Sequence, residues 1–278
     1  MEMPLVGQGQ EKGSGRSCRV GLFDSGVGGL SVWRALTLLM PGLGTLYVAD
    51  QAWCPYGGRP AADIQRRSLD IARFLLGQGA GVLVVACNTA TTQAIAFLRQ
   101  ELAVPVVGIE PATKPAALQT RTGRIAVLAT SGTLSSAHYQ RTLGRFAPHC
   151  QVGEVVVPEL VPLIESGVWE GEALESVLGE KLDALVQEGV DQLILGCTHY
   201  PFLAPWIVSR TRGVLQVLDP SPAVASRVKH ICTEQCSGSL ESPLPAHHEF
   251  WSTRDNGTLR LILSRWGVDA CIRDLELA

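Results

Sequence analysis

The chain has 278 residues, of which 46% are hydrophobic and 18% are charged, so it can bury a sizeable core and is not a disordered polymer. At a typical size of about 150 residues per domain, this length predicts two domains. The formal net charge of −3 is not that of a protein that binds nucleic acid or an anionic membrane through its overall charge.

The first 17 residues, MEMPLVGQGQEKGSGRS, lack the charged-then-apolar order of a secretory signal, and we expect them to form a mobile tail. The apolar runs of the chain are too short to span a bilayer. The chain contains eight cysteines, but one of this length does not need disulfides to be stable. We therefore expect reduced thiols and a cytoplasmic location.

Strand-like apolar runs alternate with helix-like stretches in the first half of the chain. Strands are expected within 19–26, 45–50, 81–87 and 104–111, with helices within 29–40, 61–79 and 89–102 between them. In the second of these helices, Ile64, Ser68, Ile71, Ala72 and Leu75 share one face. The neighbouring pair Arg66 and Arg67 is interpreted as part of the solvated face. This order predicts an α/β fold with a mainly parallel sheet flanked by helices.

The pattern then starts again. Arg124–Leu134 resembles Arg19–Gly29 and begins 105 residues later, while VVACNTAT and ILGCTHYP place Cys87 and Cys197 110 residues apart. Any two strands of parallel sheets can look alike, but two motifs at a nearly constant spacing favour duplication of one α/β unit. We therefore expect two pseudo-symmetric α/β domains with a cleft between them.

Two strand ends followed by proline-containing turns, Gly108–Pro115 and Val217–Val224, mark the expected boundaries. The remaining chain is too short for a third domain. It is expected to form a helix within 224–236, a strand and turn within 248–257 and a final helix within 258–267. We predict a tail at 1–17, a discontinuous first domain at 18–112 plus 222–278, and a second domain at 113–221.

Polar residues follow four of the expected strands. They form four groups: Asp24-Ser25, Cys87-Asn88-Thr89, Thr130 with Thr133, and Cys197-Thr198-His199. Ligands of open parallel sheets bind outside the carboxyl ends of the strands. If the two halves face each other, all four groups are expected to meet in one cleft.

The paired cysteines suggest two-base proton transfer. Each lies between a strand and an expected helix, where the helix N-terminus favours the thiolate. A thiol has a reference pKa of about 8.5, so Cys87 and Cys197 can each act as acid or base on opposite faces of one carbon. Two alternatives stay open: a metal site of Cys87, Cys197 and His199, and a single nucleophilic cysteine with His199 as its base. The remaining cysteines are interpreted as structural.

Asp24 precedes the glycine-rich sequence SGVGG, which does not match the GxGxxG pattern of dinucleotide sites. An acid there would repel phosphate and attract an ammonium group, while backbone amides could hold a carboxylate. This combination indicates an amino-acid site, although a simple helix cap is the alternative. The turn containing Pro55, Tyr56 and Gly57 could cover the same cleft. Glu165 ends an apolar helix-like run and, taken alone, would be an exposed helix residue.

Six segments together resemble the glutamate racemase family of the aspartate/glutamate racemase superfamily. In chain order they are GLFDSGVGGLSV, YVADQAWCPYG, VVACNTAT, LATSGTLSSAHY, VPLIESG and ILGCTHYP. The resemblance runs from about Arg19 to about Gly267. Arg59 stands where the family usually has a lysine, and the N-terminal tail is longer than in the shortest members.

The resemblance implies cofactor-independent interconversion of L- and D-glutamate, with D-glutamate supplied to bacterial peptidoglycan. It implies that Cys87 deprotonates the D-isomer and Cys197 the L-isomer, assisted by Asp24 and His199 respectively. The implied substrate-binding residues are Asp24, Ser25, Pro55, Tyr56, Gly57, Asn88, Thr89, Thr130, Thr133, Glu165, Thr198 and His199. No metal or other cofactor is implied, and a homodimer is compatible with the family. Aspartate racemase, a cysteine hydrolase and a non-catalytic amino-acid-binding module remain as alternatives.

Overall fold

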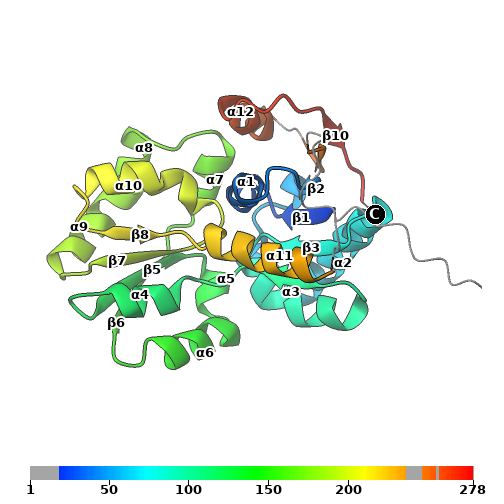
Figure 1. Ribbon diagram of the computed structural model, residues 1–278. Coiled ribbons are helices and arrows are strands. Elements are labelled where there is room, and N and C mark those ends of the chain that lie inside the picture. Colours follow the sequence, from blue (N-terminus) through cyan, green and yellow to red (C-terminus); the bar gives the residue numbers. More distant parts are fainter. Residues whose placement is uncertain (1–18, 236–245, 255–256, 278) are drawn as a thin grey trace, which may run out of the picture.

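The computed structural model describes residues 19–235, 246–254 and 257–277 (Figure 1). The expected tail at 1–17, as well as Cys18 and Cys236, lie outside the described residues. The described chain forms two parallel sheets flanked by helices, which confirms the predicted α/β class.

The first sheet has six strands in the order β10-β9-β2-β1-β3-β4, and every pair is parallel. Its strands are β1 (Val20–Asp24), β2 (Thr45–Ala49), β3 (Val82–Val85), β4 (Val106–Gly108), β9 (His248–Ser252) and β10 (Ile272–Asp274). The second sheet has four parallel strands in the order β6-β5-β7-β8. They are β5 (Arg124–Ala129), β6 (Gln151–Val155), β7 (Gln192–Gly196) and β8 (Gln216–Leu218).

The two sheets share one strand order, because β2-β1-β3-β4 in the first corresponds to β6-β5-β7-β8 in the second. The two similar sequence segments form the corresponding strands β1 and β5. This correspondence supports the duplication of one α/β unit. The exact domain boundaries stay a prediction.

The helices fill the connections between these strands. Those of the first half are α1 (Leu30–Leu39), α2 (Ala61–Gly77) and α3 (Asn88–Glu101). Those that follow are α4 (Thr113–Gln119), α5 (Ser131–Leu134), α6 (Ala137–Phe146), α7 (Leu160–Glu165), α8 (Glu172–Leu174), α9 (Glu180–Gln187), α10 (Ala204–Arg210), α11 (Ser221–Gln235) and α12 (Gly257–Arg265). Shorter helical segments are η1 (Gln51–Trp53), η2 (Tyr56–Gly58), the π-helical η3 (Glu175–Gly179) and η4 (Tyr200–Leu203).

Both faces of the first sheet are covered. In β1, Leu22 packs in a cluster with α1 and α11, whereas the next residue, Phe23, packs in a cluster with α2 and α3. Successive side chains of a strand point to opposite faces, so all five residues of β1 are buried. The first of these clusters also contains Leu128 and Leu195 of the second sheet, so the two halves share a core.

The C-terminal part of the chain returns to the first sheet, where β9 pairs with β2 and β10 pairs with β9. The expected helix within 258–267 is present as α12, but it is not the final element. The short strand β10 follows it and was not predicted, since only Ile272 of its three residues is buried.

One expectation about α2 is wrong. Its predicted apolar face is buried, but Arg67 is buried as well, while its neighbour Arg66 is exposed. Arg67 donates to the carboxylate of Asp50 at 2.8 and 2.9 Å. A charged side chain can be buried when it is paired in this way, and sequence position alone does not reveal the partner.

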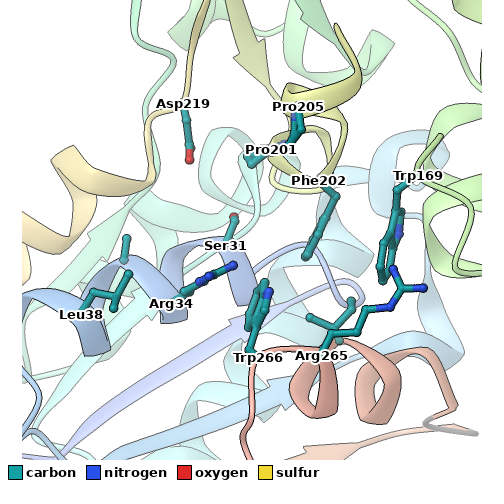
Figure 2. Close-up of a pocket in the computed structure, with 12 residues that line it drawn as sticks. Ser31, Arg34, Leu38, Trp169, Pro201, Phe202, Pro205, Asp219, Arg265 and Trp266 are labelled. Carbon is teal, nitrogen blue, oxygen red and sulfur yellow. The ribbon is translucent and has the colours of Figure 1, made fainter. Parts of the chain in front are cut away.

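An aromatic stack joins the second half to the C-terminal region (Figure 2). The ring of Trp169 stacks on Phe202 with centroids 5.7 Å apart, and Phe202 stacks on Trp266 at 6.0 Å. The guanidinium of Arg265 lies 4.4 Å from the centre of the Trp169 ring. These side chains line a cavity of about 510 Å³. The stack holds the segment after α12 against the second half.

Candidate active site

A small cavity lies at the carboxyl ends of β1, β3, β5 and β7. Its lining residues are Ser25, Pro55, Tyr56, Gly57, Cys87, Asn88, Thr89, Thr130, Val161, Cys197, Thr198 and His199. The strand ends of both sheets therefore contribute to one site. The cavity volume is about 20 Å³, which is room for about one water molecule. An amino acid can enter only if the cavity walls move apart.

Cys87 lies at the first position before α3. Its sulfur accepts a hydrogen bond from the Ala90 backbone N–H at 3.5 Å and donates to the Ser25 hydroxyl at 3.8 Å. The predicted position at a helix N-terminus is thus correct. The predicted effect on the thiol is wrong, because burial and the nearby Asp24 carboxylate raise the pKa of Cys87 far above its usual value. The Ala90 N–H lowers that pKa, but by less.

Cys197 lies at the end of β7 and does not cap an α-helix. The segment after it forms η4 instead, with Pro201 in its first turn, so the expected helix N-terminus is absent at this residue. Its partner is a side chain: the Cys197 sulfur lies 3.7 Å from Nδ1 of His199. The two thiols therefore differ in their surroundings although their sequence motifs are similar.

His199 connects Cys197 to Glu165. Its Nε2 lies 2.6 Å from the Glu165 carboxylate oxygen Oε1. Burial opposes the charged imidazolium, but the hydrogen bonds to Cys197, Cys54 and Glu165 outweigh it and raise the pKa of His199 well above its usual value. For Glu165, burial also opposes the charge, but His199 and the other donors to its carboxylate lower the pKa. We infer an ion pair beside Cys197.

Asp24 lies behind the cavity rather than in its wall and is completely buried. Its carboxylate accepts from the Gly29 N–H at 2.8 Å, at the start of α1, and from the Thr198 hydroxyl at 3.4 Å. Burial raises its pKa, although His199 opposes this. Asp24 is not the simple helix cap of the alternative, because the residue that caps α1 is Gly29. Asp24 also lies close enough to Cys87 to raise the pKa of that thiol.

Several predicted ligand-binding side chains meet across the cavity. The hydroxyl of Thr130 contacts that of Thr89 at 3.2 Å, and this contact links the two halves. Thr130 also contacts the Thr133 hydroxyl at 3.1 Å, but Thr133 lies outside the cavity lining. Both polar atoms of the Asn88 amide are buried and have no hydrogen-bond partner among the described residues. Buried polar groups nearly always have partners, so the Asn88 amide is suited to bind a ligand.

Comparisons with known proteins agree with this arrangement. Residues 32–228 match the family model described as Asp/Glu/Hydantoin racemase. The chain is 42% identical over 263 residues to the glutamate racemase of Pseudomonas paraeruginosa, covering 94% of this chain and 98% of that protein. It is 45% identical over 238 residues to the glutamate racemase of Pseudomonas aeruginosa PAO1, covering 85% and 89%. The chain belongs to the glutamate racemase family.

The similarity extends to solved structures of glutamate racemases. The crystal structure of the Escherichia coli enzyme in complex with L-glutamate and the activator UDP-MurNAc-Ala is 31% identical. It superposes with a TM-score of 0.82 and covers 94% of this chain and 99% of that chain. The predicted family resemblance is therefore confirmed over nearly the whole chain.

In this protein, Glu165 has a larger structural role than its sequence position indicated. Besides His199, its carboxylate accepts from the Val27 N–H at 2.7 Å and from the Gln51 amide at 2.9 Å. Val27 and Gln51 follow strands of the first sheet, whereas Glu165 and His199 belong to the second half. The Thr258 hydroxyl of α12 also donates to the Glu165 carbonyl at 2.6 Å. Glu165 thus connects both halves.

Residues without an obvious sequence signal also shape the site. Val161 of α7 lines the cavity, and Cys54, interpreted as structural, contacts His199. The turn with Pro55 and Tyr56 is anchored by Asp50, which accepts from the Tyr56 hydroxyl at 2.6 Å. Asp50 directly follows the apolar strand β2. A polar residue at the end of an apolar strand also drew attention to Asp24, so its strand-end location was the available signal.

The sequence analysis left open a metal site of Cys87, Cys197 and His199. Among the described residues, the potential ligand atoms of these three side chains do not form a close cluster. The described residues contain one such cluster, and it consists of Cys54, Glu165 and His199. In the described parts of the chain, no helix is both long and apolar enough to cross a membrane.

Proposed function

We propose that this protein interconverts L-glutamate and D-glutamate without a cofactor, using Cys87 and Cys197 as its two acid/base groups. The observation that carries this proposal is that two thiols, from corresponding strands of the two sheets, line one small cavity. Membership of the glutamate racemase family supports the substrate. D-glutamate would be supplied to peptidoglycan synthesis, and a cytoplasmic enzyme, alone or as a homodimer, fits that role.

The proton inventory of the reaction is simple. A thiolate on one side of the cavity removes the Cα proton, and the thiol on the other side delivers its proton to the opposite face of the same carbon. After turnover, one cysteine has gained a proton and the other has lost one. By analogy with the family, Cys87 acts on D-glutamate and Cys197 on L-glutamate.

The neighbours of each thiol fit these roles. Burial, and after it the Asp24 charge, raise the pKa of Cys87, so its thiolate, once formed, is a strong base. His199 lies 3.7 Å from Cys197 and can exchange a proton with it. The His199–Glu165 pair keeps a proton available at that side.

The Cα proton is weakly acidic, so the developing negative charge needs stabilisation. The Asn88 amide, the hydroxyls of Ser25, Thr89 and Thr198 and nearby backbone amides are proposed to hold the carboxylate and ammonium groups of the substrate. Such dipoles are most effective where water is excluded, which the small volume of the cavity favours. Opening and closing of the cavity would accompany each turnover.

The test follows Cα–H exchange of each enantiomer of glutamate and aspartate in D2O by NMR, for the unmodified protein and for Cys87→Ser and Cys197→Ser. Either substitution is expected to slow racemisation by about 100-fold or more, because a positioned acid or base contributes about 10²–10⁴-fold. Cys271→Ser, at an exposed cysteine, is the control and should keep its rate.

The same experiment separates the alternatives. Faster racemisation of aspartate than of glutamate would identify an aspartate racemase. Unchanged racemisation by Cys197→Ser would contradict the two-thiol mechanism, and loss of activity on adding a chelator would indicate a metal enzyme. Binding of glutamate without any exchange would favour a non-catalytic binding module.

A further inference from the structure

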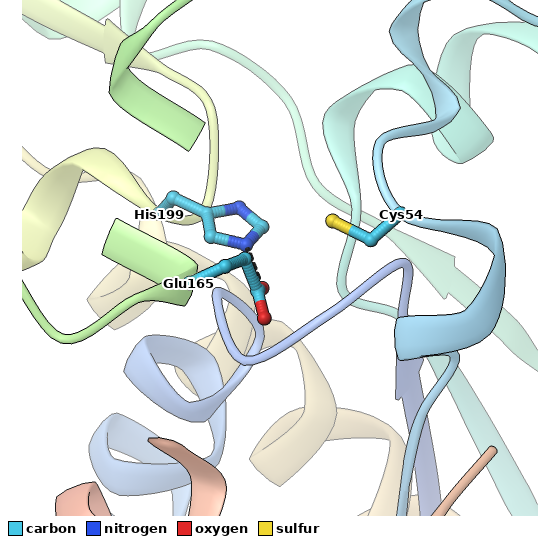
Figure 3. Close-up of side chains that lie close together, drawn as sticks. All are labelled: Cys54, Glu165 and His199. Atoms are coloured by element: carbon cyan, nitrogen blue, oxygen red, sulfur yellow. Dashed lines mark hydrogen bonds and ion pairs between the residues drawn. The ribbon is translucent and has the colours of Figure 1, made fainter. Parts of the chain in front are cut away.

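A second group of reactive side chains lies next to the substrate cavity. One ligand atom each of Cys54, Glu165 and His199 lies within 4.8 Å of the other two (Figure 3). Figure 3 shows the Cys54 thiol and the Glu165 carboxylate beside the His199 ring. Cys54 belongs to the first half, and the other two residues belong to the second. The proton-transfer mechanism makes no use of Cys54.

The three ligand types are those that bind zinc. A thiolate, an imidazole and a carboxylate coordinate Zn²⁺ at about 2.0–2.3 Å, which places tetrahedral ligand atoms roughly 3.3–3.7 Å apart. The His199 and Glu165 atoms are already 2.6 Å apart, and all three are within 4.8 Å. Side-chain movements of roughly 1 Å would therefore complete a three-ligand site with a fourth position open to water.

The cluster can be reached from outside. A cavity of about 340 Å³, distinct from the substrate cavity, has Cys54 and Glu165 in its wall and also contacts Arg254 and Thr258. The Arg254 cation opposes the entry of a metal ion, so affinity would have to come from the thiolate and imidazole ligands rather than from net negative charge. Soft thiolate and imidazole donors suit Zn²⁺, whereas Mg²⁺ and Ca²⁺ prefer oxygen ligands.

We propose that Cys54, Glu165 and His199 form a Zn²⁺-binding site that inhibits the enzyme. Binding releases the Cys54 thiol proton and the proton shared by His199 and Glu165, and the freed lone pairs coordinate the metal without any change of oxidation state. Two consequences follow. His199 can no longer exchange protons with Cys197, and a metal bridge between Cys54 and the two residues of the other half resists opening of the substrate cavity.

The inhibition test uses the full-length protein after chelator treatment and follows glutamate racemisation at buffered free Zn²⁺, with glutamate held constant. This readout rests on the proposed function. Zn²⁺ is expected to inhibit reversibly, with activity restored by excess chelator. Cys54→Ser should raise the zinc concentration for half-inhibition at least tenfold, each variant being compared with its own zinc-free rate. Cys271→Ser, at an exposed thiol, should behave as the unmodified protein does.

A second measurement is independent of activity. Co²⁺ in place of Zn²⁺ should give a thiolate-to-metal charge-transfer absorption with one metal per chain. This absorption should be present in Cys271→Ser, absent in Cys54→Ser and weaker in Glu165→Gln, with circular dichroism confirming that each variant is folded.

Zinc inhibition and the cobalt spectrum together distinguish failure of the proposed metal site from failure of the proposed function. Unchanged zinc inhibition or an unchanged cobalt spectrum in Cys54→Ser would overturn the proposed site and point to the cysteines of the substrate cavity. A cobalt spectrum that depends on Cys54, in a protein that does not racemise glutamate, would support the site and refute the proposed function. Absence of both inhibition and metal binding would also overturn the site.

Discussion

Two cysteines with similar sequence motifs have different partners in the folded protein. Cys87 lies between a helix N–H and the buried Asp24, whereas Cys197 contacts His199. A helix terminus lowers a thiol pKa, but burial and a nearby negative charge raise it, and for Cys87 the latter two dominate. The acid/base behaviour of each thiol therefore depends on which charges the fold places next to it.

The clearest residue-level prediction concerns Asn88. Its amide is buried and makes no hydrogen bond to any described residue, so removing it should cost the free protein little stability. We expect Asn88→Ala to lower kcat/KM for glutamate by roughly 10–100-fold, which corresponds to about 1.4–2.7 kcal/mol of lost transition-state binding. Steady-state kinetics and urea unfolding measure the two effects.

Thr91, on the same helix, is the matched control for Asn88. Its hydroxyl donates to the Val85 carbonyl at 3.1 Å and accepts from the Ile109 N–H at 3.1 Å. Thr91→Val should therefore reduce stability and leave kcat/KM much less affected. A large loss of stability in Asn88→Ala with unchanged kinetics would show that the Asn88 amide is structural.

At the scale of the structural elements, the Pro55–Gly57 turn is positioned by a buried charge pair. Asp50 binds Tyr56, Arg67 of α2 and the Thr253 hydroxyl that follows β9. The side chains of Asp50 and Arg67 are 0% and 5% exposed. If one of the two charges were removed, water could therefore not solvate the other. One carboxylate thus links the turn, a helix and the returning C-terminal segment.

Asp50→Asn should destabilise the protein and disturb the turn. Removing one member of a buried pair typically costs about 3–5 kcal/mol, because the remaining charge is left without a partner. We also expect KM for glutamate to rise, since Tyr56 loses its anchor. Denaturant unfolding and steady-state kinetics test both effects.

The exposed pair of Asp63 and Arg66 on α2 provides the control for Asp50→Asn. Its side chains are 40% and 67% exposed, and such surface pairs contribute about 0–1 kcal/mol. Asp63→Asn should therefore change neither stability nor KM appreciably. Equal effects of the two substitutions would contradict the anchoring role of Asp50.

For the molecule as a whole, Glu165 is the most concentrated link between the halves. It receives hydrogen bonds from Val27 and Gln51 on one side and pairs with His199 on the other. Its pKa is lowered, so the stability it provides is present above the ordinary glutamate pKa of about 4.3 and is lost as the pH falls through its folded pKa. For His199, whose pKa is raised, the contribution is present below about pH 6.5 and is lost as the pH rises through its folded pKa.

The unmodified protein should therefore lose stability in acid. Glu165→Gln should remove the part of this loss that comes from protonation of Glu165. We expect the free energy of unfolding to fall as the pH drops below about 4.3. Over this range the free energy of unfolding of Glu165→Gln should fall by about 1.5–3 kcal/mol less than that of the unmodified protein, the value typical of hydrogen bonds to a charged group. Urea unfolding across this range measures the difference between the two proteins and so cancels the titration of other groups. Glu175→Gln, at a side chain that is 48% exposed and pairs with Arg210, is the control. Parallel curves for the unmodified protein and Glu165→Gln would refute the prediction.

The sequence by itself determined the α/β class, the repeated unit and the strand ends that meet at the cavity. These follow from the alternation of apolar runs and from the rule that parallel strands present their carboxyl ends at one edge. The two cysteine motifs could be recognised because each lies where a strand ends. Resemblance to a family added the roles of the individual residues, and the geometry permits these roles.

Only the tertiary structure decided which charges and hydrogen bonds surround those residues. It placed Asp24 behind Cys87 and His199 beside Cys197, buried Arg67 against Asp50 and brought Cys54 to the Glu165–His199 pair. Except for the pair of Cys197 and His199, which are two positions apart, these contacts join residues 17 to more than 100 positions apart. Neither local propensity nor hydrophobic periodicity carries information about contacts over such separations. The pKa of each buried group depends on its distance from the others, so it is set when the two halves pack together.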